Sequence, residues 1–412
     1  MIVLAGGDIV LPDRLVSAGS VVIADGRIVA IDPRPRVEPS GATVIDITGH
    51  YVVPGFIDVH VHGVDGRDTL DGADSVAFIA SRLPRHGVTA FCPTAVACPP
   101  GDLSAFVHQV RTSRTAPRPG SARVLPAHLE SNFINPEFRG AQPAACLRTP
   151  GDSIAARAVQ ARPANPKASP RDIAAADFTA TDILDVIASA RPDIGIVTLA
   201  PELDGGVDLV RDLVAAGHRV SLGHSGADVD TAIAAIEAGA RHATHLFNRM
   251  TPMAHRAPGL AGAVLSREDI AAELICDGFH VHQAMSRMAI SAKGVRGIMA
   301  ITDGTAGSGL PIGASARLGS QTIHVRDTAA FLSDGTLAGS TLTMDRAFAT
   351  IVTSFGHSVV DAAILCSTTP ASELGLTGLG VIADGAIADL AVLDRDFRVA
   401  RTFIESEEVF RR

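Results

Sequence analysis

The chain has 412 residues, of which 47% are hydrophobic and 19% are charged, so it can bury a sizeable core. This length exceeds one ordinary small domain and suits a large α/β barrel with a minor domain. The net charge of −9 and the pI of about 5.9 argue against nucleic acid or an anionic membrane as a partner, so an anionic small molecule would have to meet locally placed arginines.

The cysteines and the first residues predict a reduced, cytoplasmic protein. The five cysteines are scattered, odd in number and form no CxxC pair, which is not the pattern of a disulfide framework. The opening MIVLAGGDIVLPDRLV lacks a basic segment and is broken by Gly, Asp and Pro, unlike a signal peptide. No apolar stretch is long enough to predict a membrane span.

The two ends of the chain share a strand-and-turn texture. Residues 1–54 contain short apolar runs with an Asp25-Gly26 hairpin turn, and residues 372–412 repeat the pattern with Asp384-Gly385. We expect these two segments to pair as one small, discontinuous β-sandwich domain around a central domain of residues 55–371.

The central domain alternates short apolar runs with helical segments such as 206–216 and 228–238. Eight candidate strands are predicted, at 56–62, 89–93, 124–130, 194–202, 219–224, 242–246, 271–277 and 297–303. Eight strand–helix repeats are typical of a (β/α)8 TIM-type barrel. Residues 149–181, rich in Ala, Pro and Arg, are too long for an ordinary connection and are predicted to be an insertion, either a lid or a disordered segment.

Residues that can bind a metal occupy the carboxyl ends of five of these strands, where barrel enzymes keep their active sites. The predicted ligands are His60, His62, Glu130, His224, His245 and Asp303. In the HxH pair, strand alternation places both imidazoles on one face. A lone histidine is more often structural, but the joint pattern would require five separate coincidences. Histidines with carboxylate oxygens suit zinc and neighbouring divalent ions.

The remaining histidines are predicted to be less directly involved. His128 precedes Glu130 by two residues and should line the barrel interior below the metal, whereas His280, just past the seventh strand, should contact substrate at the rim. The others fall in loops, helices or strand starts and are interpreted as structural, including His242. The glycine-rich runs at 304–309 and 375–380 are interpreted as turns, because neither follows the plan of a dinucleotide site.

These residues and their surroundings resemble the amidohydrolase superfamily and, within it, the N-acetylglucosamine-6-phosphate deacetylase family. The resemblance runs nearly end to end, with 149–181 as the main excess. It rests on the order of PGFIDVHVHG (54–63), HLE and FINPEFRGA (128–141), TLAPE (198–202), GHS (223–225), THLFN (244–248), PGLAGAVL (258–265), CDGFHV (276–281), ITDGTAGSGLP (301–311) and LAGSTLTMD (337–345).

The resemblance implies metal-assisted amide hydrolysis, with Asp303 as the catalytic proton acceptor. Many superfamily members bridge two metals with a carbamylated lysine, but the only lysines here are Lys167, in the insertion, and Lys293, before the eighth strand. Glu130 is therefore expected to fill that role. The metal is expected to be Zn²⁺, with one or two ions bound per chain. Because His60 and His62 are both retained, two ions are favoured over one.

For the substrate, the resemblance implies an amino-sugar phosphate, with N-acetylglucosamine 6-phosphate as the default. Arg256 matches a phosphate-binding arginine that the family offers across a dimer interface, so a homodimer is expected. The other substrate-binding residues predicted, besides His280, are Asn132, Gln142, Asn248 and Arg249. Three of these depart from the family pattern: Ser131-Asn132 replaces Gly-Pro, Gln142 replaces a histidine, and Arg249 replaces a small residue, which places an additional positive charge toward the ligand.

Three alternatives stay open at this point. The same chemistry could act on N-acetylgalactosamine 6-phosphate or on an N-acyl amino acid. A non-catalytic protein on the same scaffold is the third reading, although such proteins generally lose metal ligands and all six positions are filled here.

Overall fold

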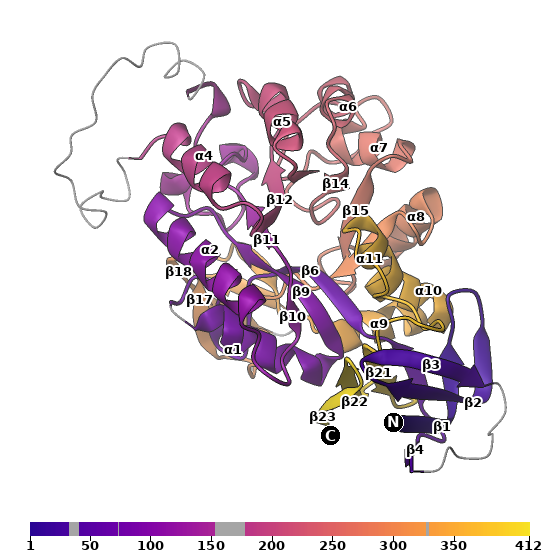
Figure 1. Ribbon diagram of the computed structural model, residues 1–412. Coiled ribbons are helices and arrows are strands. Elements are labelled where there is room, and N and C mark those ends of the chain that lie inside the picture. Colours follow the sequence, from indigo (N-terminus) through magenta and orange to yellow (C-terminus); the bar gives the residue numbers. More distant parts are fainter. Residues whose placement is uncertain (33–40, 73, 153–177, 327–328) are drawn as a thin grey trace.

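The computed structural model describes residues 1–32, 41–72, 74–152, 178–326 and 329–412. A parallel barrel occupies the centre, with helices around it, and both chain termini lie in a separate sheet at one side (Figure 1). Most of the predicted insertion at 149–181, together with Lys167, lies outside the described residues. Among the described residues, no helix is both long enough and apolar enough to cross a membrane.

The barrel confirms the predicted (β/α)8 fold. Its strands are β6 (Phe56–Val61), β9 (Val88–Ala95), β11 (Ala127–Glu130), β12 (Ile194–Leu199), β13 (Arg219–Leu222), β14 (His242–Ala243), β15 (Ala271–Ile275) and β16 (Ile298–Ile301). Each pairs in parallel with its neighbour in this order. These strands are buried almost throughout, as expected for a parallel sheet covered by helices.

The last strand meets the first at the carboxyl end of the barrel. There Val61 and Gly304 form a parallel bridge, and the Asp303 amide donates to the His60 carbonyl at 3.1 Å. The predicted third strand, 124–130, is split into β10 (Arg123–Val124) and β11. Pro126 falls in the gap, where it has no N–H to donate to a ladder.

The described helices surround the barrel (Figure 1). They are α1 (Ser75–Arg82), α2 (Pro100–Thr115), α4 (Ala180–Ser189), α5 (Gly206–Ala215), α6 (Val229–Glu237), α7 (Gly259–Ser266), α8 (Gln283–Lys293), α9 (Met344–Thr353), α10 (Val359–Ala363) and α11 (Thr369–Glu373). Several begin at side-chain caps read directly from the sequence: Asp228 accepts from the Thr231 amide, and Thr179 forms a capping box with Asp182.

The terminal segments form one eight-stranded sheet. Its strands are β1 (Ile2–Val10), β2 (Leu15–Ala24), β3 (Arg27–Asp32), β4 (Thr43–Asp46), β5 (Tyr51–Pro54), β21 (Leu390–Leu393), β22 (Val399–Ile404) and β23 (Glu407–Arg411). The antiparallel pair of β5 with β21 joins the N-terminal and C-terminal parts. The sheet has its own buried cluster, which includes Ile23, Ile28 and Phe403. The exact limits at 54 and 372 stay a prediction.

A further antiparallel sheet follows the last barrel strand and was not predicted. It consists of β17 (Ser315–Leu318), β18 (Gln321–Arg326), β19 (Ala329–Leu332) and β20 (Leu337–Ser340), and a shorter pair is formed by β7 (Gly63–Val64) and β8 (Arg67–Asp68). A bridge between Gly304 and Ser340 ties β20 to the carboxyl end of the barrel. The alternation in QTIHVR and the Asp334-Gly335 turn were the signals available for it.

Candidate active site

All six predicted metal-binding side chains come together at the carboxyl end of the barrel. None is more than 7% exposed. His60 lies in β6 and His62 directly follows it, Glu130 ends β11, and His224, His245 and Asp303 lie two positions beyond the last residues of β13, β14 and β16. Residues far apart in the sequence therefore share one small volume because parallel strands all end at the same face.

Three of these residues have a left-handed backbone. The φ angles are +49° at His224, +29° at His245 and +49° at Asp303. Non-glycine residues rarely adopt this conformation, and it costs free energy that the surrounding structure must offset. It also ends the strands, so the predicted strands 219–224, 242–246 and 297–303 extend two or three residues too far. Beyond the bend, the side chains of all three residues contact other candidate ligands.

Glu130, His224 and His245 form one compact group. The Oε1 atom of Glu130 lies 2.8 Å from Nε2 of His224 and 2.9 Å from Nε2 of His245. The two Nε2 atoms lie 3.0 Å apart. On the far side of its ring, His224 donates from Nδ1 to the Phe138 carbonyl at 2.8 Å, which leaves the Nε2 lone pair directed at the group.

His60, His62 and Asp303 form a second group beside the first. The Nε2 atoms of the two histidines lie 3.1 Å apart, and each is 3.3 Å from Oδ1 of Asp303. Glu130 lies between the groups, with its two oxygens 3.9 Å from Nε2 of His60 and 3.5 Å from Nε2 of His62. A single carboxylate can therefore serve both groups.

Both groups fit a divalent metal ion. A tetrahedral ion with bonds of ~2.0–2.1 Å to nitrogen separates its ligand atoms by roughly 3.3 Å. The Nε2–Nε2 distances of 3.0 and 3.1 Å are close to that value, and each group contains two imidazoles and a carboxylate. Two unprotonated imidazole nitrogens would not be held this close without a cation or a proton between them.

The buried carboxylates of the site favour positive charge beside them. Burial would raise the pKa of Glu130, but His224 and the other imidazoles hold it well below its usual range. Burial would lower the pKa of His60, but Glu273 and Asp303 raise it to about 9. For His62, burial is likewise outweighed by Asp303 and Glu130, and the pKa is about 10. A divalent cation can take the place of the protons that these imidazoles would otherwise carry.

A pocket opens above the two groups, and four of the six predicted substrate-binding residues line it: Gln142, Asn248, Arg249 and His280. Gln142 donates to Oε2 of Glu130, and its own Oε1 accepts from the Ala97 amide at 2.8 Å. His280 pairs through Nδ1 with Asp277 at 2.6 Å, while its buried Nε2 has no partner among the described residues. That nitrogen is available to a bound molecule.

The other two predicted substrate-binding residues are not part of the pocket. Asn132 is buried and donates both amide hydrogens to backbone, to the Cys98 carbonyl at 2.9 Å and the Cys146 carbonyl at 2.7 Å. In the structure the Asn132 amide therefore ties two loops together, and its contact with substrate stays a prediction. Arg256 is exposed and does not line the pocket of its own chain.

Two features of the site were missed from the sequence. Glu273, in the middle of β15, is fully buried and accepts hydrogen bonds from His60 and His242, so His242 belongs to the site's supporting network. An acidic residue inside the apolar run AAELI was the available signal, because a buried charge requires partners. The roof of the pocket was the second: Leu318, Leu337 and Gly339 come from the unpredicted sheet.

The remaining lysine in the described residues does not reach the site. Lys293 ends α8, before β16, and its Nζ donates to the Arg267 carbonyl. It therefore lies at the amino end of the barrel strands.

Comparison with known proteins agrees with this geometry. Residues 51–409 match the model of the amidohydrolase family. The N-acetylglucosamine-6-phosphate deacetylase of Bacillus subtilis (strain 168) is 33% identical over 406 residues, 98% of this chain and 95% of that protein. The N-acetylgalactosamine-6-phosphate deacetylase of Escherichia coli O157:H7 is 32% identical, over 93% of each chain.

Solved structures give the same result. The N-acetylglucosamine-6-phosphate deacetylase of Thermotoga maritima superimposes with a TM-score of 0.82 at 30% identity, over 100% of both chains. A mutant of the Mycobacterium smegmatis enzyme, solved in complex with N-acetyl-D-glucosamine-6-phosphate, gives a TM-score of 0.83 at 30% identity over 99% of both chains. The chain belongs to the amidohydrolase family and, within it, to the N-acetylglucosamine-6-phosphate deacetylase family.

Proposed function

We propose that this protein is a metal-dependent deacetylase that hydrolyses N-acetylglucosamine 6-phosphate to glucosamine 6-phosphate and acetate. The observation that carries the proposal is the convergence of two His–His–carboxylate groups on a pocket, in a chain whose relatives are named for this reaction. The nitrogen and oxygen ligand set favours Zn²⁺, and the two adjacent groups favour two ions over one.

The chemistry divides between the metal and the chain. A bound divalent ion lowers the pKa of water and polarises the acetyl carbonyl. Asp303 accepts the proton of the water that attacks the carbonyl carbon. It then passes this proton to the amide nitrogen as the C–N bond breaks, so that the products are acetate and a free amine. His280 and Gln142 orient the acetylated sugar from the walls of the pocket.

A panel of substrates tests the reaction and the sugar together. Metal-reconstituted protein should release acetate fastest from N-acetylglucosamine 6-phosphate, more slowly from N-acetylgalactosamine 6-phosphate, and poorly from unphosphorylated N-acetylglucosamine and N-acyl amino acids. The galactosamine substrate is the second candidate, because a 32% identical relative is named for it. Preference for that sugar would reassign the substrate; no acetate from any of these compounds would favour the non-catalytic reading.

Recognition of the 6-phosphate is proposed to depend on arginines, since a guanidinium can bind phosphate through two hydrogen bonds. Arg249 lines the pocket beside Asn248, and it packs so closely on Gly140 that an added Cβ there would lie 2.6 Å from its Nε. Arg249→Ala should raise KM for the phosphorylated sugar by roughly 10- to 100-fold, as loss of a charge-assisted hydrogen bond does. Activity on unphosphorylated substrate, measured at high concentration, should be nearly unchanged.

Arg256 provides the test of the proposed homodimer. Because it does not line its own pocket, Arg256→Ala should raise KM only if the residue reaches the pocket of a second copy. Mixing Arg256→Ala protein with the inactive variant Asp303→Asn should then restore some active sites with native KM. Arg267→Ala, which removes a partly exposed arginine paired with Asp269, is the matched control and should leave KM unaltered.

The cellular setting is proposed to be the cytoplasm. All five cysteines are buried and free, which suits a reducing compartment. Amino-sugar phosphates are also charged molecules that do not cross membranes unaided.

A further inference from the structure

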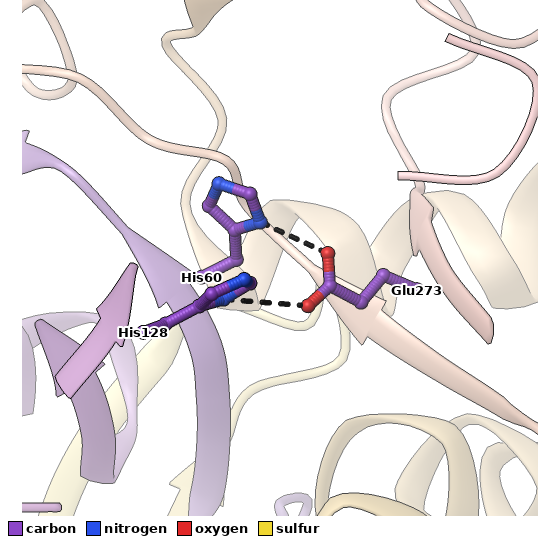
Figure 2. A group of neighbouring side chains, drawn as sticks. All are labelled: His60, His128 and Glu273. Carbon is purple, nitrogen blue, oxygen red and sulfur yellow. Dashed lines mark hydrogen bonds and ion pairs between the residues drawn. The ribbon is translucent and has the colours of Figure 1, made fainter. Parts of the chain in front are cut away.

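Glu273 lies in β15 and contacts one residue from each of the two candidate metal groups, His60 and His245. Its side chain is 0% exposed. It accepts hydrogen bonds from Nδ1 of His60 at 2.9 Å, from Nε2 of His242 at 2.8 Å and from the backbone amide of His245 at 3.1 Å. Figure 2 shows the carboxylate reaching across the barrel from β15 to the rings of His60 and His128.

His60, His128 and Glu273 are close enough to form a third metal group, but the hydrogen bonds of His128 argue against it. Nδ1 of His128 donates to the Val59 carbonyl at 3.0 Å, and Nε2 accepts from the Thr198 hydroxyl at 2.8 Å. A carbonyl oxygen can only accept, so Nδ1, the nitrogen 3.6 Å from Glu273, carries a hydrogen and cannot bind a metal. Glu273 must therefore be explained through His60.

The direction of each hydrogen bond around Glu273 follows from Arg219. Nε of Arg219 always carries a hydrogen and donates to Nδ1 of His242 at 3.2 Å, so His242 must carry its own hydrogen on Nε2 and donate it to Glu273. The other carboxylate oxygen accepts from Nδ1 of His60. This leaves the Nε2 lone pair of His60 directed at His62 and Asp303.

We propose that Glu273 is a positioning residue for the second metal group: by accepting from Nδ1 of His60 it sets how tightly His60, His62 and Asp303 hold an ion, while Arg219 and His242 set the direction of the hydrogen bonds to its carboxylate. The proposal rests on the metal-dependent function proposed above. Burying a carboxylate fully costs desolvation free energy, which is offset only if its oxygens accept the hydrogen bonds that water would have donated. Outer partners of this kind commonly change metal affinity by roughly 10- to 100-fold.

Glu273→Gln is a sharp test because glutamine has almost the same shape but cannot satisfy all partners. If the amide oxygen faces His60 and the His245 amide, its NH2 faces Nε2 of His242. His242 must then move its hydrogen to Nδ1, where it meets the Arg219 N–H. If the amide is flipped, the NH2 meets the His245 backbone N–H, which cannot move its hydrogen. Either orientation leaves two donors facing each other.

In Glu273→Gln we expect one ion to be lost and one to be kept. Affinity for the second equivalent of Zn²⁺ should fall roughly 10- to 100-fold, while the ion at Glu130, His224 and His245 is retained. The measurement is metal content after dialysis against graded chelator, together with the visible absorption of Co²⁺-loaded protein. Asp193→Asn, which removes a 3% exposed carboxylate paired with Arg111 and Arg114, is the matched control and should keep both ions.

A second substitution separates hydrogen-bond direction from loss of charge. Arg219→Met alone should keep both ions, because His242 can still donate to Glu273. In the double variant Glu273→Gln with Arg219→Met, His242 is free to carry its hydrogen on Nδ1 and accept from the glutamine. The second ion should then bind more tightly than in Glu273→Gln alone. If Glu273→Gln does not fold, the affinity for the second ion is compared between the double variant and Arg219→Met. That comparison still measures what replacing the Glu273 carboxylate does to the second metal group.

The outcomes are distinct. The inference is overturned if Glu273→Gln binds both ions as the wild type does, if it loses both to the same extent, or if the double variant shows no recovery. A wild type that holds one ion and hydrolyses the substrate would also overturn it, while the proposed function stands. A wild type that holds two ions but releases no acetate would contradict the proposed function and leave the inference about Glu273 standing.

Discussion

Asp303→Asn should retain the metal content of the wild type and lower kcat by about 10²- to 10⁴-fold, the range associated with loss of a proton-transferring group. The substitution keeps the shape of the side chain and one oxygen near His60 and His62. Two backbone hydrogen bonds hold Asp303 independently of its side chain. The Asp303 amide donates to the His60 carbonyl at 3.1 Å, and the Asp303 carbonyl accepts from the Ser340 amide at 2.9 Å. What is lost is the basic oxygen that accepts the proton of water.

Acetate release and metal content should be measured on the same preparation. Asp193→Asn, at the far end of the barrel, controls for the loss of a buried carboxylate and should keep near-normal kcat. Near-normal turnover in Asp303→Asn would remove this residue from the mechanism. If Asp303→Asn loses metal together with activity, the main role of Asp303 is to bind the metal, and the loss of activity is no evidence that it accepts a proton.

Glu130→Gln should have the opposite signature, losing metal and activity together. This carboxylate contacts both groups, and its charge offsets the imidazoles that surround it. A glutamine that keeps its oxygen toward His224 and His245 would present its NH2 to the NH2 of Gln142, which now donates to the glutamate. We expect metal affinity to fall at least about 100-fold, beyond the effect of an outer partner.

Excess metal in the assay distinguishes the two variants. Activity of Glu130→Gln should recover partly as Zn²⁺ is raised, whereas that of Asp303→Asn should not. Glu202→Gln is the matched control: Glu202 accepts from the Ser225 hydroxyl at 2.7 Å and the Gly226 amide at 2.6 Å, beside His224, but does not belong to either metal group. Unchanged metal affinity in Glu130→Gln would show that the glutamate does not bridge the groups.

The barrel was predictable because its signal is local. Each parallel strand is a short apolar run between helical segments, and helix starts such as Asp228 carry their own caps. The strand ends were less predictable, since His224, His245 and Asp303 leave the strands in a left-handed conformation that no local propensity favours. Contacts formed after folding stabilise that conformation.

The support of the site was not predictable for the same reason. Glu273 and His60 are separated by 213 positions, and the role of His242 depends on a bond from Arg219 at the opposite end of its ring. Asn132 was expected to contact substrate because it departs from the family pattern beside Glu130. Its amide is instead used by the Cys98 and Cys146 carbonyls, which only the folded loops bring to it.

The sequence by itself determined the fold class and placed six metal-competent residues at the strand ends, because side-chain chemistry and strand periodicity are properties of short segments; the reaction type followed from the resemblance of its motifs to the deacetylase family. The tertiary structure decided how those residues are used. It put Glu130 between two groups, directed Nε2 of His60 toward the site through Glu273, and covered the pocket with an extra sheet. Hydrogen-bond partners and ring orientation depend on which distant strands become neighbours, and that is settled only when the barrel closes.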